Sequence, residues 1–189
     1  MESSTSSETG SSTTPDPSLV ATSGPPATPS PIPLPTDTPV PSERLALAHR
    51  AFTAGNYALA QQEFAALLND PGINPDEQST TLYWRGRSEL AAGQAEAAID
   101  TFNLFLADYP TDPLVRAAQF NLGRAYEQSG QSDQAITTYL GALIPDDPVN
   151  VYIYERIGNI ALQTRAYDRA IEAYQAGTDS TEDIALETR

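Results

Sequence analysis

The stretch that decides the fold reads Gly123-Arg124-Ala125-Tyr126, followed by Gly130, Ala135-Ile136, Tyr139 and Ala142. The same order of glycine, alanine and aromatic residues occurs in the segment before it, with Gly86, Gly93, Ala98-Ile99 and Phe102. The segment after it contains Gly158, Tyr167, Ala170-Ile171 and Tyr174. A weaker first copy contains Gly55, Tyr57, Ala60, Phe64 and Ala66. The chain therefore holds four copies of one pattern.

The spacing of the copies predicts stacked helical hairpins. Equivalent alanines, namely Ala60, Ala98, Ala135 and Ala170, lie 38, 37 and 35 residues apart. A period of this length is typical of helical repeat proteins, in which each hairpin buries its apolar face only against its neighbours. Capping residues before prolines and turn glycines place the helices. We expect them at 42–54, 57–69, 76–92, 95–108, 113–129, 132–143, 148–164 and 167–177, with Ser132 as a cap.

The repeat resembles the tetratricopeptide repeat (TPR), over about three quarters of the chain. That resemblance implies an all-α, right-handed α-solenoid of about four hairpins, at 42–74, 75–111, 112–147 and 148–178. It also implies that the small residues let the two helices of a hairpin approach closely, while the aromatic residues Phe64, Phe102, Tyr139 and Tyr174 fill the space between neighbouring hairpins. Two positions depart from the pattern, since Ala48 and Arg165 stand where glycines are expected.

The ends of the chain differ from the repeats. Residues 1–41 hold ten of the sixteen prolines and seventeen serines or threonines, with no aromatic or basic residue. Such a composition predicts a disordered linker or stalk, because it cannot bury enough apolar surface to order itself; a specific proline-rich ligand motif is the alternative. Residues 179–189 are expected to start a further, truncated helix.

The composition excludes several classes of function. The net charge is −15, and all ten basic residues are arginine, so binding to nucleic acid is not expected. There is no cysteine and a single histidine, His49, so we expect no metal, no cofactor and no catalytic site. No run is long and apolar enough for a transmembrane segment. This segment is therefore predicted not to be an enzyme.

A binding groove is the better candidate site. In TPR folds, defined positions of each first helix line the concave surface. By that resemblance, the groove residues here are His49, Tyr83, Arg87, Phe120, Arg124, Tyr152, Glu155 and Asn159. Arginines suit carboxylates and aromatic rings supply apolar anchors, which favours an acidic protein or peptide partner. The alternative is that Arg87 and Arg124 pair with acidic neighbours such as Glu127 or Glu155.

Two functions remain open. The run from Ala98 to Leu114, with its Phe-x-x-Phe-Leu-x-x-Tyr-Pro ending, resembles bacterial cell-envelope TPR proteins, which implies a non-enzymatic scaffold for protein–protein interaction. The tail, the repeats and the helix around Gly158 also resemble the N-terminal TPR region of lytic transglycosylases, whose catalytic domain would lie beyond residue 189.

The composition of the N-terminal tail gives an expectation of the cellular location. A stretch rich in serine, threonine and proline often follows an export signal or a lipid-bearing cysteine in bacterial surface proteins. No signal peptide follows Met1, so we expect Met1 to mark an artificial start or a trimmed precursor. A periplasmic or surface location, with peptidoglycan association, is the expectation; a cytoplasmic location is the alternative.

Overall fold

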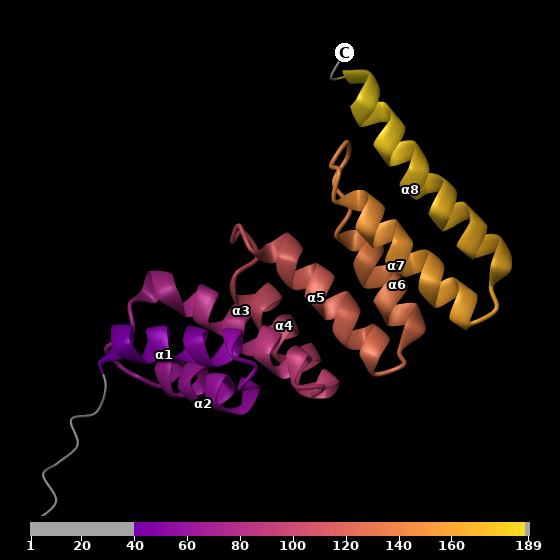
Figure 1. Ribbon diagram of the computed structural model, residues 1–189. Coiled ribbons are helices and arrows are strands. Elements are labelled where there is room, and N and C mark those ends of the chain that lie inside the picture. Colours follow the sequence, from indigo (N-terminus) through magenta and orange to yellow (C-terminus); the bar gives the residue numbers. More distant parts are fainter. Residues whose placement is uncertain (1–39, 188–189) are drawn as a thin grey trace, which may run out of the picture. The chain divides into compact units, whose positions relative to one another are not determined.

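The computed structural model describes residues 40–187, with side chains described to residue 180, and this part of the chain is entirely helical. Figure 1 shows its helices in sequence order. They are α1 (Pro41–Thr53), α2 (Tyr57–Leu68), α3 (Pro75–Ala91), α4 (Ala95–Asp108), α5 (Val115–Gln128), α6 (Ser132–Gly141), α7 (Asn150–Gln163) and α8 (Tyr167–Glu187). The tail predicted to be disordered lies outside the described residues, except at its last two positions.

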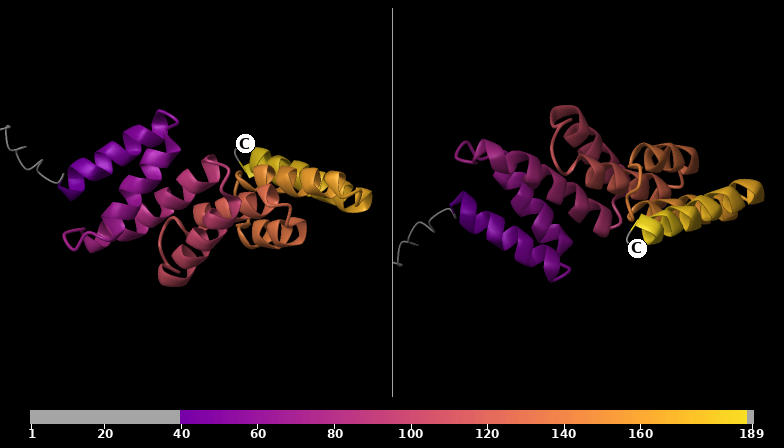
Figure 2. Two further views of the ribbon diagram at one scale, coloured as in Figure 1. Left: turned by 90° about the horizontal axis from the view of Figure 1, so that it is seen from below. Right: turned by 90° about the horizontal axis from the view of Figure 1, so that it is seen from above.

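Consecutive helices form four hairpins, α1–α2, α3–α4, α5–α6 and α7–α8. Within each hairpin the two helices pack along one another, and the second helix then packs against the first helix of the next hairpin. The views in Figure 2 show the same succession from two further sides. The predicted all-α solenoid of stacked hairpins is confirmed.

Close approach inside a hairpin depends on one glycine in each of the last three hairpins. A Cβ added to Gly123 would lie 2.6 Å from ring atoms of Tyr139 in the same hairpin. Gly86 and Gly158 meet Phe102 and Tyr174 in the same way, at 2.9 and 2.6 Å. The aromatic residues were expected to fill the space between neighbouring hairpins. Each of these three rings packs on the glycine of its own hairpin, and Phe102 and Tyr139 also belong to apolar clusters that include the first helix of the next hairpin, as expected.

The turn inside each hairpin needs a left-handed residue. Gly55, Gly93 and Gly130 supply it with φ of 76 to 79°. In the fourth hairpin Arg165 takes the same position with φ of 62°. A residue with a Cβ is strained in this region, so the fourth turn keeps the geometry of the other three at a cost in free energy.

The predicted helix starts are only partly right. Asn74 caps α3 as expected, since its Oδ1 accepts a hydrogen bond from the backbone N–H of Asp76. Asp112 and Asp147 also accept bonds from backbone N–H groups two residues ahead. There they form turns before the helix, so α5 and α7 start two residues later than the prediction. Ser132 is the first residue of α6 and makes no capping bond.

The junction between the third and fourth hairpins is unlike the earlier ones. The connection over residues 142–149 is long, and α6 packs against α7 less extensively than any other consecutive helices in the described part do. The backbones of the first helices α3 and α5 also lie close to each other, whereas those of α5 and α7 stand further apart and are joined mainly by side chains. An opening is therefore left between α5 and α7.

The last helix differs from the expectation of a helix ending near residue 177 and a new one after 179. Helix α8 instead continues to Glu187. Gly177 lies within this helix, and a Cβ added to it would lie 3.3 Å from the Cβ of Tyr154. The glycine therefore allows close packing on α7 and does not form a turn. The hydroxyl of Ser180 donates to the carbonyl of Ala176, as suits a continuous helix. None of the described helices has the length and apolar character needed to cross a membrane.

Candidate functional site

The eight predicted groove residues all lie on the first helices of the hairpins, but the structure divides them into two groups. His49, Tyr83 and Arg87 lie on α1 and α3, where they pack into a cluster of aromatic rings. Phe120, Tyr152, Glu155 and Asn159 lie on α5 and α7 and line one pocket. Arg124 lies on α5 in the adjoining pocket. The second group and Arg124 therefore surround an opening.

The first group is built around Trp84. The guanidinium carbon of Arg87 lies 4.3 Å from the centre of the Trp84 ring, and also over Phe52 and Tyr83 at 5.2 and 5.8 Å. A guanidinium in this position is held by the faces of the rings. Its packing role makes Arg87 a poor contact for a partner.

His49 and Tyr83 belong to the same packed region. The ring of His49 meets Trp84 edge-on at 4.9 Å and Phe64 at 5.4 Å, and burial lowers the pKa of His49. Tyr83 is buried, and its hydroxyl accepts a hydrogen bond of 3.2 Å from Asn121. The structure thus places Tyr83 in the core rather than on the surface of a groove, whereas His49 is half-buried beside Trp84.

The pocket between α5 and α7 is lined by both apolar and polar side chains. Its volume is about 540 Å³, and it is lined by Phe120, Val149, Tyr152, Glu155, Arg156 and Asn159. Tyr152 is 61 % exposed and Val149 is 45 % exposed, although both are large and apolar. Phe120 is held from behind by Tyr139, with ring centres 5.6 Å apart. This pocket offers apolar contact surface that the described part of the chain does not cover.

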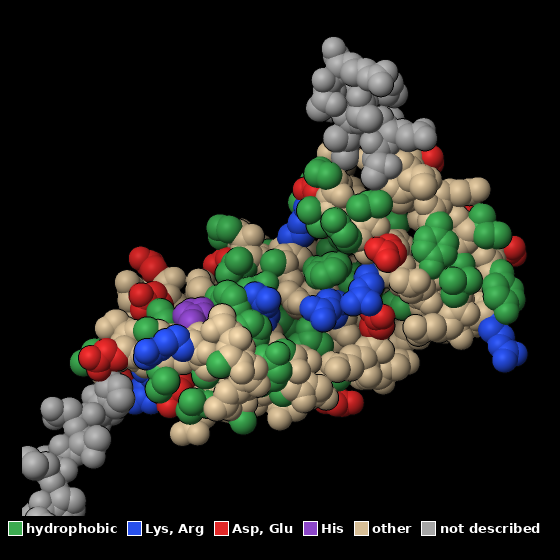
Figure 3. All heavy atoms as spheres, viewed as in Figure 1, with side chains coloured by type: hydrophobic (Ala, Val, Ile, Leu, Met, Phe, Trp, Pro, Cys, Tyr) green, Lys and Arg blue, Asp and Glu red, His purple; other side chains and the backbone are tan. Residues whose placement is uncertain are grey.

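A second pocket, of about 350 Å³, shares the lining residue Arg156 with the first. Its lining is polar and comprises Leu90, Arg124, Glu127, Gln128, Arg156 and Gln163. We call the two pockets together the α5–α7 groove. Figure 3 shows arginine and hydrophobic side chains gathered together on the face over α3 and α5.

Glu127 is the best-satisfied charge in this groove. Its carboxylate accepts a hydrogen bond of 2.9 Å from the Tyr139 hydroxyl and one of 3.3 Å from Arg156. Burial, with the Glu127 carboxylate adding to it, raises the pKa of Tyr139, so the hydroxyl stays protonated and donating. Arg124 is exposed and makes a weak 3.5 Å bond to Asn121, with no carboxylate at ion-pair distance among the described side chains. The positive charge of Arg124 is therefore available to a partner.

The alternative prediction, that Arg87 and Arg124 pair with Glu127 or Glu155, is wrong. Glu127 pairs with Arg156, which the sequence analysis did not select. Arg156 lies one turn before Asn159, at a position that the family pattern does not assign to the groove. Val149 was missed as well, because the predicted helix start hid its place in the connection before α7. Arg156 could have been selected from the sequence, because it is a charged residue one helical turn before the predicted groove residue Asn159.

Asn159 is oriented by the last helix. Its Oδ1 accepts a hydrogen bond of 2.8 Å from the hydroxyl of Tyr174 on α8. This bond fixes the side-chain amide and leaves its nitrogen as a donor at the side of the pocket. Among the side chains that the structure describes, no three His, Asp or Glu residues come together in a way that could hold a metal ion.

The comparisons with known proteins agree with the architecture. A family model described as tetratricopeptide repeat matches residues 45–113, 85–150 and 120–183. No curated protein matches the chain.

Solved structures with the same arrangement of helices include MamA from Desulfovibrio magneticus RS-1, with 19 % identity, a TM-score of 0.64 and 76 % of each chain covered. Another MamA crystal structure is 20 % identical with a TM-score of 0.64, covering 78 % of this chain and 81 % of that one. A putative kinesin light chain with TPR-like repeats from Podosopora anserina is 17 % identical with a TM-score of 0.55, covering 78 % and 74 %. At these identities the likeness concerns the fold alone.

Proposed function

The chain belongs to the tetratricopeptide repeat family, and we propose that it is a non-enzymatic scaffold that binds a segment of a protein partner in the α5–α7 groove. The family fold is typically that of a protein-interaction scaffold. The observation that carries the choice of surface is the uncovered apolar pocket formed by Phe120, Val149 and Tyr152.

Exposed aromatic residues beside a pocket are suited to anchoring a partner. Tyrosine contributes strongly to protein interfaces because it buries a large rigid ring while keeping a polar end. Tyr152 combines high exposure with a place beside Phe120, whose ring is fixed by Tyr139. An apolar side chain of the partner would therefore meet a preformed surface.

The charges in the groove favour a partner with carboxylates. Arg124 has no acidic partner among the described side chains, and Arg156 shares Glu127 with Tyr139. Glu155 and Glu127 also line the groove, so the arginine best placed for a partner carboxylate is Arg124. Because Arg87 is held between rings, Arg124 and Arg156 replace the predicted pair Arg87 and Arg124 as the electrostatic contacts.

The test is a selection of peptides from a random library on the immobilised full chain, followed by affinity measurements on two matched variants. Tyr152→Ala removes the proposed anchor, and Tyr167→Ala removes a tyrosine of similar exposure on α8. We expect Tyr152→Ala to weaken the selected peptides by about 2 kcal/mol or more, as is typical of an interface hot spot. Equal affinities for both variants would place binding elsewhere.

The charge part of the proposal has its own pair of variants. Arg124→Ala should weaken binding at low salt and reduce its salt dependence, since exposed charges act mainly on association. Arg169→Ala removes an arginine that lines a different pocket, between α6 and α8, and should leave binding unchanged. If the two variants behave alike, Arg124 is not a contact.

We propose the bacterial cell envelope, periplasmic or surface-exposed, as the setting of this scaffold. The support is the composition of the N-terminal tail and the run from Phe102 to Pro110, both features of the sequence alone. Fractionation of cells that express the natural gene tests the location, and co-sedimentation with purified peptidoglycan tests association with the cell wall. Recovery in the cytoplasm alone would contradict this proposal.

The alternative is that these hairpins form the non-catalytic part of a cell-wall lytic transglycosylase. The arrangement of tail and repeats supports it. Reading the gene beyond the codon for Arg189 decides between the two, because a lysozyme-like domain must follow in the alternative and is absent in the scaffold.

A further inference from the structure

Two polar bridges join the third and fourth hairpins, and the aromatic pocket of the groove lies between them. At the first bridge, Arg116 near the start of α5 reaches Asn150 at the start of α7. At the second, Glu127 near the end of α5 meets Arg156 in the middle of α7. Phe120 follows the first bridge along α5, as Tyr152 does along α7. The two bridges therefore determine how far apart the walls of the pocket stand.

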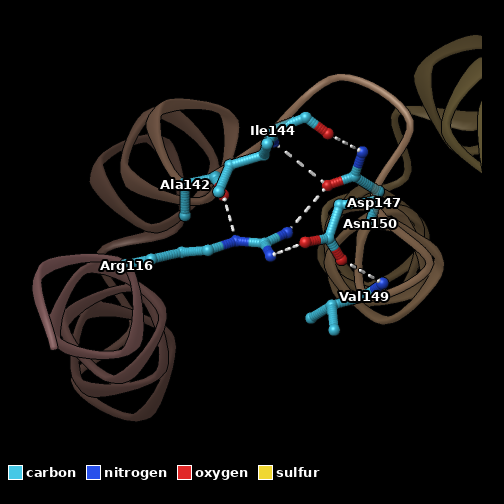
Figure 4. A network of polar contacts seen from close by, with 6 residues as sticks. All are labelled: Arg116, Ala142, Ile144, Asp147, Val149 and Asn150. Carbon is cyan, nitrogen blue, oxygen red and sulfur yellow. Dashed lines mark hydrogen bonds and ion pairs between the residues drawn. The ribbon is translucent and has the colours of Figure 1, made fainter. Parts of the chain in front are cut away.

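The first bridge is an extensive network, which Figure 4 shows from close by. The guanidinium of Arg116 donates to the carbonyl of Ala142 at 3.0 Å, to the carboxylate of Asp147, and to Oδ1 of Asn150 at 3.0 Å. Asn150, which is buried, also bonds both backbone groups of Ile144. We call these five residues the Arg116 network. It ties the end of α6, the connection and the start of α7 to one side chain of α5.

The second bridge is weaker. The Arg156–Glu127 ion pair is 3.3 Å long, and the Arg156 side chain is 37 % exposed. Exposed ion pairs contribute little to stability and are screened by salt. Glu127 also keeps the Tyr139 hydroxyl as a partner when Arg156 leaves. This second bridge can therefore break without leaving a buried carboxylate unpaired.

Between the bridges little holds the fourth hairpin at one angle. Helices α6 and α7 pack over a limited area, and the apolar cluster that they share, around Ile136, Ile153 and Ile157, has no directional bonds. Open space lies on both sides of α7. One space is the pocket beside Phe120, and the other is a cavity of about 270 Å³ between α6, α7 and α8. Rotation of the hairpin can narrow one space while it widens the other.

We infer that the fourth hairpin, α7–α8, pivots about the Arg116 network, and that the Glu127–Arg156 ion pair is a latch that sets the width of the α5–α7 groove. Arg116 is thus a positioning residue for the groove. A carboxylate of a partner that binds Arg156 competes with Glu127, so binding and release of the latch are coupled. This consequence rests on the proposed function, whereas the motion itself is measured without any ligand.

The experiment uses pairs of spin labels on introduced cysteines. Because the chain has no cysteine of its own, the labels attach only at the chosen positions. Glu96, Asp133 and Asp168 are exposed and occupy equivalent positions at the starts of α4, α6 and α8. The pair Asp133→Cys with Asp168→Cys reports on the third and fourth hairpins. The pair Glu96→Cys with Asp133→Cys is the matched control for the second and third.

We expect Arg116→Ala to broaden and shift the distance distribution of the first pair and to leave the control pair unchanged. Raising the salt concentration, or the substitution Glu127→Gln, should shift the first pair in the otherwise unaltered chain, so the test stands even if Arg116→Ala folds poorly. Arg116→Lys, which keeps the charge but lacks the fork of donors, should have an intermediate effect. If the two pairs respond alike, or the first pair does not respond, the hinge is wrong.

The same experiment separates the hinge from the proposed function. If the first pair responds but Tyr152→Ala does not weaken peptide binding, the hinge is supported and the proposed binding site is contradicted. If Tyr152→Ala weakens binding but the two label pairs respond alike, the binding site is supported and the hinge is contradicted.

Discussion

The junction between the second and third hairpins is held mainly by apolar packing, whereas the junction between the third and fourth depends more on polar contacts. At the first, α4 and α5 pack through a continuous core that includes Phe105, Ala118 and Leu122, and α3 adds direct contacts to α5. At the second, α6 and α7 pack over a smaller area, and Arg116 supplies the main polar link. The first junction is thus stabilised by a large buried apolar area, and the second by a few hydrogen bonds near the start of α5.

This difference matters because a repeat protein is stabilised by the sum of its hairpins and of the interfaces between neighbours. Where one interface is weaker, the stack can open there first while the rest stays folded. The groove lies at the same junction, since the pocket that Phe120 and Tyr152 line is found where α5 and α7 stand apart. The opening between hairpins and the candidate binding site are thus one feature of the structure.

The largest effect is expected from Leu122→Ala, at the apolar junction. Leu122 is buried in the cluster shared by α3, α4 and α5. Removal of a buried leucine side chain costs about 2–5 kcal/mol, through lost burial and the cavity left behind. Chemical denaturation should show a single transition at lower denaturant. A change below 1 kcal/mol on this scale would mean that this junction is not the stronger one.

Next in size is Arg116→Ala, at the polar junction. Hydrogen bonds to a charged group contribute about 1.5–3 kcal/mol, and the buried Asn150 loses a partner as well. We expect a split or broadened unfolding transition, because the fourth hairpin separates from the others.

The matched control for Arg116→Ala is Arg50→Ala. Arg50 is exposed on α1 and donates a 3.4 Å hydrogen bond to the carbonyl of Ala46 in its own helix, so its removal should change stability by less than about 0.5 kcal/mol. It should leave the shape of the transition unchanged. A sharp, parallel transition for Arg116→Ala would show that the polar junction couples the hairpins as firmly as the apolar one.

A smaller gain is expected from Arg165→Gly in the turn of the fourth hairpin. Arg165 has a φ of 62°, where the other three hairpins have glycine. Relief of this strain should stabilise the chain by about 1 kcal/mol. Gly130→Ala, in the equivalent turn of the third hairpin, should lose a similar amount. Thermal melts of both variants check the sign, and two losses would show that Arg165 is held by contacts that outweigh its strain.

The smallest effects should come from pH, in two separate windows. Burial lowers the pKa of His49, so its contribution to stability in the α1–α3 region is present above the ordinary histidine value of about 6.5 and is lost as the pH falls through the lowered pKa. The backbone N–H of Val149, and after it Arg116, lower the pKa of Asp147. The contribution of Asp147 is present above about pH 3.9 and is lost as the pH falls through its lowered value.

Titration followed by fluorescence and circular dichroism checks the order of these events. His49→Gln should abolish the first step and leave the second. A second step that persists unchanged in Asp147→Asn would show that Asp147 is not its cause.

Much of the fold could be predicted because the repeat carries it. The glycines and aromatic residues that meet inside each hairpin recur at a regular spacing, so Gly123 and Tyr139 reveal the hairpin on their own. The connections between hairpins do not follow the repeat, so their structure could not be predicted in this way. Asp147 before a proline has the same sequence signal whether it caps a helix or forms a turn ahead of one, and only the packing of Arg116 shows which.

The candidate site was predicted only in part for a related reason. Phe120, Arg124, Tyr152, Glu155 and Asn159 line the groove because the family pattern places their helix face correctly. The same pattern places His49, Tyr83 and Arg87 on that face, but between α1 and α3 these side chains pack against Trp84 or one another, and none of them lines the α5–α7 groove. Sequence periodicity indicates the direction of a side chain. Whether neighbouring helices close over it depends on the angle between hairpins.

The most direct test of this account is hydrogen exchange of the free protein, followed helix by helix at neutral pH. If the polar junction is where the stack opens, the amides of α7 should exchange faster than those of α3, α4 and α5, and Arg116→Ala should accelerate α7 and α8 alone. Equal protection of α5 and α7, lost together as one unit, would contradict the account.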